Sequence, residues 1–153
     1  WCAATLLSMI GLFNIFGTLT SGYLSTKYPK KLVLSFIYFM RGVVISLFIF
    51  LPPSPTLAVL FGITFGFLWL ATVPPTAGIV AFIFGTKYMG LLYGIVFLSH
   101  QVGSFFGAYL GGVFKEVYGS YDYAWYVSIA LSIFAGLIHL PIKEKQVERL
   151  QIA

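Results

Sequence analysis

A few polar and ionisable side chains lie deep inside long apolar stretches of this 153-residue chain. The most costly is Arg41, which lies about ten residues from either end of its stretch, or roughly 15 Å at about 1.5 Å per residue of helix. A charge at the centre of a bilayer costs roughly 2.5 to 3.5 kcal/mol on insertion scales, so a buried arginine is by default a candidate for function. We expect Arg41 to pair with helix carbonyls, with an acid outside this chain or with an anionic substrate, unless its head reaches toward a membrane surface.

His100 is the only side chain at mid-membrane depth that can exchange a proton near neutral pH. The acidic residues lie at or beyond the ends of the apolar stretches: Glu116, Asp122, Glu144 and Glu148. Gln101 follows His100 about 100° further round the predicted helix, so we expect only one of the two to face a given surface. An uncharged packing histidine is the alternative interpretation.

Asn14 belongs to a stripe of small and polar residues spaced by three or four, which places them on one face of a helix. The stripe consists of Gly11, Asn14, Thr18, Ser21 and Ser25. Such a face turns toward other helices or a watery cavity inside a membrane. The hydroxyls can bond to their own helix, which makes packing alone a sufficient explanation for them. The amide of Asn14 lacks that option.

Two adjacent prolines, Pro74 and Pro75, interrupt the longest apolar stretch. Prolines remove backbone donors and break a helix, which frees carbonyl groups in the middle of the span. Broken helices at membrane depth are typical of transport sites, and Trp69, Thr72 and Thr76 lie around this break. A kink that serves packing is the alternative.

The stretches that contain these side chains are predicted to be helices that cross a membrane. The composition is 59% hydrophobic and 8% charged, against roughly 25% charged residues in soluble domains, which excludes a soluble fold. Five apolar stretches each reach the length of roughly 20 residues that a spanning helix needs. The sequence therefore predicts an all-α integral membrane fold over residues 1–142, with helices at about 1–24, 32–51, 57–84, 88–114 and 123–142, and a tail at 143–153.

The basic residues lie almost entirely in the gaps between these stretches. If the chain changes side at every span, only Lys115 lies on one side, and the other side holds Lys27, Lys30, Lys31, Lys87, Lys143, Lys145 and Arg149. The positive-inside rule makes that side cytoplasmic, including the C-terminus. Because the positive charges are dispersed, anionic lipid headgroups are the expected partner rather than nucleic acid. A single cysteine and the lack of a Cys/His cluster predict neither a metal site nor a cofactor.

The predicted fourth span is rich in glycine. Ser99, Gly103, Gly107 and Gly111 follow at intervals of four, the spacing that lets two membrane helices touch backbone to backbone. We expect this stripe to be a helix-packing face rather than a site of chemistry.

Two segments resemble the major facilitator superfamily. The first basic gap resembles its cytoplasmic loop motif, with the glycine and basic positions taken by Gly22, Lys27, Lys30 and Lys31. Thr26 stands where that motif has an acid, and Pro29 where it has a second glycine, as in the degenerate copy of a C-terminal half. The run from Gly85 to Gly112 resembles the region of the tenth and eleventh helices, closest to bacterial members of the monocarboxylate-transporter-like group.

The resemblance implies that the chain is a fragment that lacks the N-terminal half of the protein. It would comprise helices eight to twelve of a twelve-helix transporter in a bacterial inner membrane. The resemblance also implies alternating access for a small solute, such as a monocarboxylate or another small organic anion, with proton coupling through His100 or an acid of the missing half. Most candidates then lie on helices that approach the central pathway: Asn14, Trp69, Thr72, Thr76, His100 and Gln101. Arg41 lies on a peripheral helix.

A non-transporting membrane scaffold or assembly subunit is the alternative function. Polar groups at mid-membrane depth, such as Asn14 and His100, argue against it. An enzyme is not expected. The neighbours Ser99 and His100 do not face each other on a helix, so they form no nucleophilic dyad.

Overall fold

The computed structural model of the protein describes residues 2–147, with side chains from residue 4 onward. Six helices account for most of this part of the chain, and it contains no strand. They are α1 (Cys2–Lys27), α2 (Lys30–Phe50), α3 (Pro55–Trp69), α4 (Val73–Phe84), α5 (Met89–Tyr118) and α6 (Asp122–His139). The predicted all-α class is confirmed.

Four helical segments are long and apolar enough to cross a membrane: Ala4–Lys27, Lys30–Phe50, Pro55–Phe84 and Met89–Tyr118. The third of these contains both α3 and α4, because the long predicted span is interrupted. Helix α6 has 18 residues and corresponds to the fifth predicted span.

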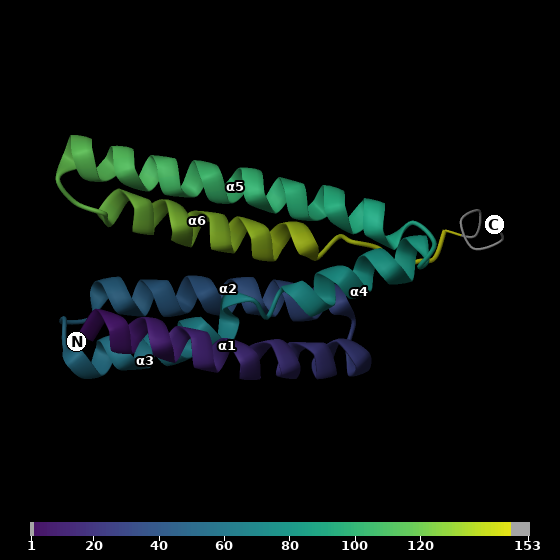
Figure 1. Ribbon diagram of the computed structural model, residues 1–153, viewed down its shortest axis with the longest axis horizontal. Coiled ribbons are helices and arrows are strands. Elements are labelled where there is room, and N and C mark those ends of the chain that lie inside the picture. Colours follow the sequence, from purple (N-terminus) through teal and green to yellow (C-terminus); the bar gives the residue numbers. More distant parts are fainter. Residues whose placement is uncertain (1, 148–153) are drawn as a thin grey trace.

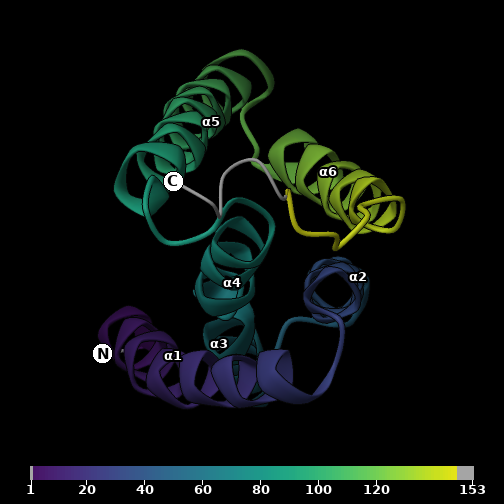
Figure 2. The ribbon, with the colours of Figure 1, turned by 90° about the vertical axis from the view of Figure 1, so that its right-hand side faces the viewer.

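The helices surround α4 when the molecule is seen from its end. Helices α1 and α3 lie on one side of α4, α5 lies on the opposite side, and α2 and α6 lie next to each other along a third side (Figures 1 and 2). The main packing pairs are α1 with α3 and α2 with α6. Helix α5 packs mainly on α4 and α6, and none of its 30 residues, all described, is buried.

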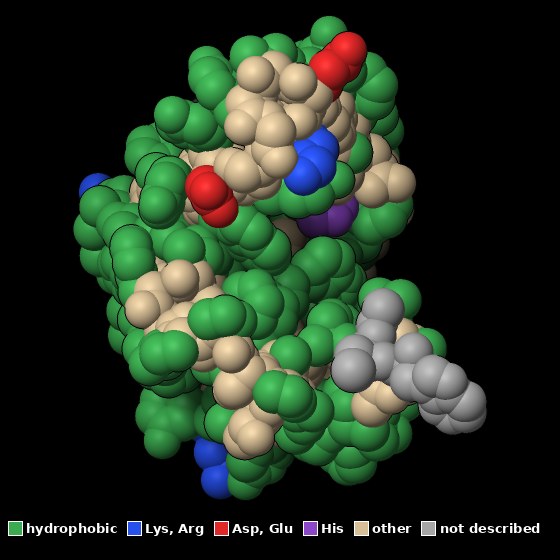
Figure 3. Space-filling model, turned by 90° about the vertical axis from the view of Figure 1, so that its left-hand side faces the viewer, with side chains coloured by type: hydrophobic (Ala, Val, Ile, Leu, Met, Phe, Trp, Pro, Cys, Tyr) green, Lys and Arg blue, Asp and Glu red, His purple; other side chains and the backbone are tan. Residues whose placement is uncertain are grey.

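The basic gaps meet at one end of the molecule. The end of α1, the start of α2, the α4–α5 loop and the end of α6 all lie at the right of Figure 1, whereas the α2–α3 and α5–α6 loops lie at the left. The predicted sides of the basic residues agree with this arrangement from Lys27 to Lys145, with Lys115 at the opposite end; Arg149 lies outside the described residues. Seen from that opposite end, the surface is mostly hydrophobic, with few charged side chains (Figure 3).

Close backbone contact joins α1 to α3. A Cβ atom at Gly17 would collide with the carbonyl of Phe67, and one at Gly66 would lie 2.6 Å from the Cα of Ile10. Small residues at such contacts allow membrane helices to approach closely, where packing contributes most of the association energy. The α1–α3 pair therefore depends on glycine at both positions.

A polar bond and a small residue join α2 to α6. The Ser35 hydroxyl donates to the Gly136 carbonyl at 2.7 Å, and both residues are buried. The ring of Phe39 lies 3.0 Å from where a Cβ atom of Gly136 would stand. A hydroxyl that bonds across two helices is a common form of contact inside a membrane.

Candidate functional site

The long apolar span is broken, as the sequence predicted. Helix α3 ends at Trp69 and α4 begins at Val73, with both prolines in the first turn of α4. The first turn of a helix tolerates proline because its N–H groups have no partner within the helix. The N–H of Val73 donates to the Leu70 carbonyl at 3.0 Å, one residue closer than in an α-helix. The break therefore covers Leu70 to Thr72.

Arg41 of α2 binds the carbonyl end of α3. Its Nη2 donates to the carbonyl of Leu68 at 2.7 Å and to that of Trp69 at 2.9 Å. The guanidinium lies over the ring of Tyr38, with Cζ 5.3 Å from the ring centroid, and its buried Nε has no hydrogen-bond partner. Of the partners that the sequence allowed for Arg41, the structure shows the helix carbonyls.

Asn14 of α1 binds the same break from another side. Its Oδ1 accepts the N–H of Leu70 at 3.0 Å. Ala71, the next residue, is 1% exposed and belongs to the hydrophobic cluster of Val33, Ile37 and Leu68. The break is thus packed among apolar side chains and held by polar groups from two helices.

Trp69, Thr72 and Thr76 lie at and just beyond the break. The Thr76 hydroxyl donates to the Thr72 carbonyl at 2.6 Å, and Thr72 is the N-cap residue of α4 without a side-chain capping bond. The indole of Trp69 is half exposed and makes a T-shaped contact with the ring of Phe65, with 5.1 Å between the ring centroids. Arg41 thus binds the backbone of Trp69, and Thr72 and Thr76 bond to each other at the start of α4.

His100 and Gln101 lie elsewhere. Both are exposed on α5, and the ring of His100 lies 6.0 Å from that of Phe97, one turn earlier on the same helix. The carbonyl of His100 accepts the Ser104 hydroxyl at 3.0 Å. Neither residue takes part in the hydrogen bonds at the break.

The glycine stripe of α5 faces open space within the described part of the chain. Cβ atoms at Gly103, Gly107 and Gly111 would meet nothing within 4 Å. The packing role predicted for these glycines remains a prediction.

The residues of the loop motif make contacts at the basic end. Lys27 lies over the ring of Tyr23, with Nζ 4.5 Å from its centroid, and Lys30 lies over that of Phe82 at 5.1 Å. The backbone N–H of Lys31 donates to Glu144 Oε1 at 2.7 Å. A Cβ atom at Gly22 would lie 3.7 Å from the Cβ of Pro74, which is ordinary contact.

Sequence reasoning missed two features. Gly17, which α3 requires, was not singled out, although Ser21 and Ser25 follow it at the same four-residue spacing as in the α5 stripe. Glu144 caps the start of α2 from the tail, and its only signal was the alternation of basic and acidic residues there.

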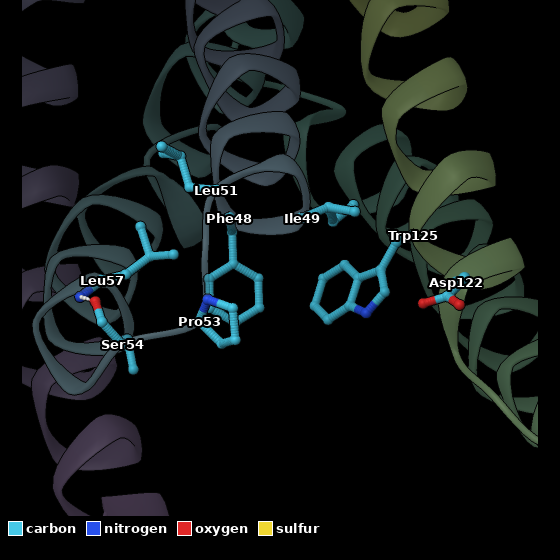
Figure 4. A pocket seen from close by; sticks show the side chains of 9 residues that line it. Phe48, Ile49, Leu51, Pro53, Ser54, Leu57, Asp122 and Trp125 are labelled. Carbon is cyan, nitrogen blue, oxygen red and sulfur yellow. Dashed lines mark hydrogen bonds between the residues drawn. The ribbon is translucent and has the colours of Figure 1, made fainter.

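Two hollows lie among the described residues, one away from the break and one that reaches it. One, of about 370 Å³, lies between the end of α2 and the starts of α3 and α6, where Phe48 and Trp125 face each other beside Asp122 (Figure 4). The other, of about 380 Å³, is an almost wholly apolar groove between α1, α2 and α3 that includes Leu68 and Ala71.

Comparisons with known proteins place the chain in a family. It is 32% identical over 146 residues to monocarboxylate transporter 13 of Rattus norvegicus, and 30% identical over 146 residues to that of Bos taurus; each match covers 91% of this chain and 33% of the relative. It is 30% identical over 139 residues to the uncharacterized MFS-type transporter YcxA of Bacillus subtilis (strain 168), covering 86% of this chain and 33% of that protein.

The chain thus spans about a third of the length of the curated relatives it matches. No solved structure matches it. The model of the Major Facilitator Superfamily matches residues 3–151, almost the whole sequence. The chain is therefore a multi-pass membrane protein that belongs to the Major Facilitator Superfamily.

Proposed function

We propose that the chain is the C-terminal part of a secondary active transporter that moves a small solute by alternating access. The observation that carries this proposal is the helix break at Leu70 to Thr72, with Asn14 and Arg41 bound to its backbone. Interrupted helices in transporters place backbone groups and polar side chains at a site near the membrane midplane. Family membership supports the same function.

The proposed substrate is a small organic anion such as a monocarboxylate. Two relatives carry the name monocarboxylate transporter 13. Among the described residues, no acidic side chain bonds to Arg41, which binds backbone carbonyls instead. A cation that has no acidic partner leaves its neighbourhood positive, which favours an anion. The proposed pathway residues are Asn14, Arg41, Trp69, Thr72, Thr76, His100 and Gln101.

The proposed partner is an N-terminal half of the same protein, which the α5 stripe would face. A stripe of glycines that is open in this chain offers a surface for a close helix contact. The lysine-rich end would lie in the cytoplasm of a bacterial cell, next to anionic headgroups. His100 is the proposed proton carrier on α5.

Uptake into liposomes tests the transport function. The full-length protein is reconstituted, and the uptake of labelled pyruvate is measured against that of succinate and of glucose. We expect saturable pyruvate uptake, and we expect Thr76→Val to lower it by about 3- to 10-fold, the effect of one lost hydrogen bond to the substrate. Thr64→Val is the matched control, because this exposed hydroxyl bonds to the Leu60 carbonyl of its own helix.

The outcomes separate the proposals. If no solute is taken up, the chain is better explained as a non-transporting scaffold. If glucose is taken up and pyruvate and succinate are not, the proposal of an anionic substrate is wrong. If His100→Gln leaves the pH dependence of uptake unchanged, His100 is not the proton carrier.

A further inference from the structure

We infer, on the basis of the transport function proposed above, that Asn14 and Arg41 are positioning residues that act together as one clamp on the helix break. The clamp consists of the Asn14 amide, the Arg41 guanidinium and the backbone of residues 68–70 between them. It holds the interruption in the shape that places Thr72 and Thr76 at the start of α4. Its members act on the substrate through the backbone that they hold.

First, Arg41 replaces the backbone donors that are missing at the break. In a continuous α-helix the carbonyls of Leu68 and Trp69 would accept N–H groups four residues later. At the break Val73 donates to Leu70 instead. Arg41 supplies the replacement donors to both carbonyls through one nitrogen, at 2.7 and 2.9 Å.

The second step concerns charge. The carbonyl end of a helix carries a partial negative charge, which favours a cation placed against it. The ring of Tyr38, 5.3 Å from the guanidinium carbon, adds a second favourable contact. The buried arginine is thereby stabilised in part by a helix end. About half an elementary charge there offsets only part of the guanidinium charge, so the surroundings of Arg41 remain positive.

The third step is the complementary role of Asn14. The N–H of Leu70, which would bond four residues back in a continuous helix, donates to Asn14 Oδ1 at 3.0 Å. Arg41 supplies donors and Asn14 supplies an acceptor to three consecutive residues. Leu68 is buried on this segment, whereas Trp69 and Leu70 are 49% and 40% exposed, so the Leu68 carbonyl is the group that would be left without a partner if the clamp were lost.

Two measurements on the full-length protein test the clamp. The first is hydrogen–deuterium exchange of the amides of residues 70–73 in detergent micelles, which requires no substrate. The second is pyruvate uptake into liposomes. The variants are Asn14→Leu, Arg41→Leu, their combination and the conservative Arg41→Lys. Thr18→Val is the matched control, since the Thr18 hydroxyl bonds only to the Asn14 carbonyl of its own helix at 2.8 Å.

We expect each leucine variant to speed exchange at residues 70–73 by about tenfold, because the local opening loses a hydrogen bond. The double variant should be little worse than the more severe single one, since both residues hold the same segment. In the leucine variants the maximal rate of pyruvate uptake should fall, and the KM should change by less than about threefold. Arg41→Lys keeps a donor for the carbonyls and should restore both readouts in part, and Thr18→Val should match the wild type.

Unchanged exchange at residues 70–73 in the Asn14 and Arg41 variants would overturn the clamp. The clamp would also be overturned if the fold-change in exchange rate of the double variant equalled the product of the two single fold-changes, because the residues would then act independently. If Arg41→Leu does not fold, Asn14→Leu and Arg41→Lys still decide by exchange. A wild type without pyruvate uptake would contradict the proposed function, whereas the exchange measurement would still decide on the clamp.

Discussion

Hydroxyl and amide side chains on α1 satisfy their hydrogen bonds in two different ways. The hydroxyls of Thr18, Ser21 and Ser25 donate to carbonyls three or four residues earlier on α1. The Asn14 amide instead reaches the backbone of the α3–α4 break. A hydroxyl is short and lies close to its own helix, whereas an amide side chain extends beyond it. On α1 the amide therefore joins two helices and these hydroxyls do not, whereas on α2 the Ser35 hydroxyl does reach a second helix.

Glycine at position 17 should be needed for the α1–α3 contact. Gly17→Ala places a methyl group against the Phe67 carbonyl, so the helices must separate, and we expect a loss of roughly 1 to 3 kcal/mol in stability. Thermal unfolding of the full-length protein in detergent measures this loss. Gly11→Ala is the control, because the space beside Gly11 on the same helix is open. Equal effects of the two variants would contradict the close contact.

At the scale of the element, the break was predictable and its partners were not. Pro74 and Pro75 are visible in the sequence, and their missing donors require a helix to restart there. Arg41 precedes the carbonyls it binds by 27 and 28 residues. Its choice among carbonyl, acid and anion depends on how α2 lies against α3, which no local pattern encodes. The spans and the basic end follow from hydropathy and charge alone, because both depend on single segments.

Helix α5 illustrates the opposite case, a clear pattern without a contact in the described residues. Under the proposed function its glycines face the other half of the protein. We expect Gly107→Leu to reduce uptake by about tenfold, because leucine would force apart two backbones that glycine allows to touch. Ala108→Leu is the control, since it adds nearly the same volume about 100° away on the helix. If Gly107→Leu transports like the wild type, the stripe does not form a close contact.

At the scale of the whole molecule, the segment after α6 ties three helices together at the basic end. Glu144 accepts the N–H of Lys31 at the start of α2, and the Lys31 ammonium donates to the Leu140 carbonyl at 3.1 Å. The N–H of Val147 donates to the Ile83 carbonyl of α4 at 2.9 Å. Helices α2, α4 and α6 therefore share contacts that the individual spans do not reveal.

Removing the acceptor at residue 144 should weaken this end of the molecule. We expect Glu144→Leu to cost about 0.5 to 2 kcal/mol, as for other lost helix caps, and Glu144→Gln to cost less because its amide oxygen still accepts. Unfolding of the full-length protein in detergent measures both. Glu116→Leu at the opposite end is the control, and a loss of the same size there would show that the cap contributes nothing of its own.

The bond from Glu144 to Lys31 spans 113 residues of sequence. A ribosome that adds roughly 5 to 20 residues per second needs roughly 6 to 23 seconds to make that length of chain. During this interval the first turn of α2 exists without the carboxylate that accepts its N–H group. The start of the second helix is therefore completed only when the last described residues emerge, which makes the order of synthesis part of how this end of the protein is assembled.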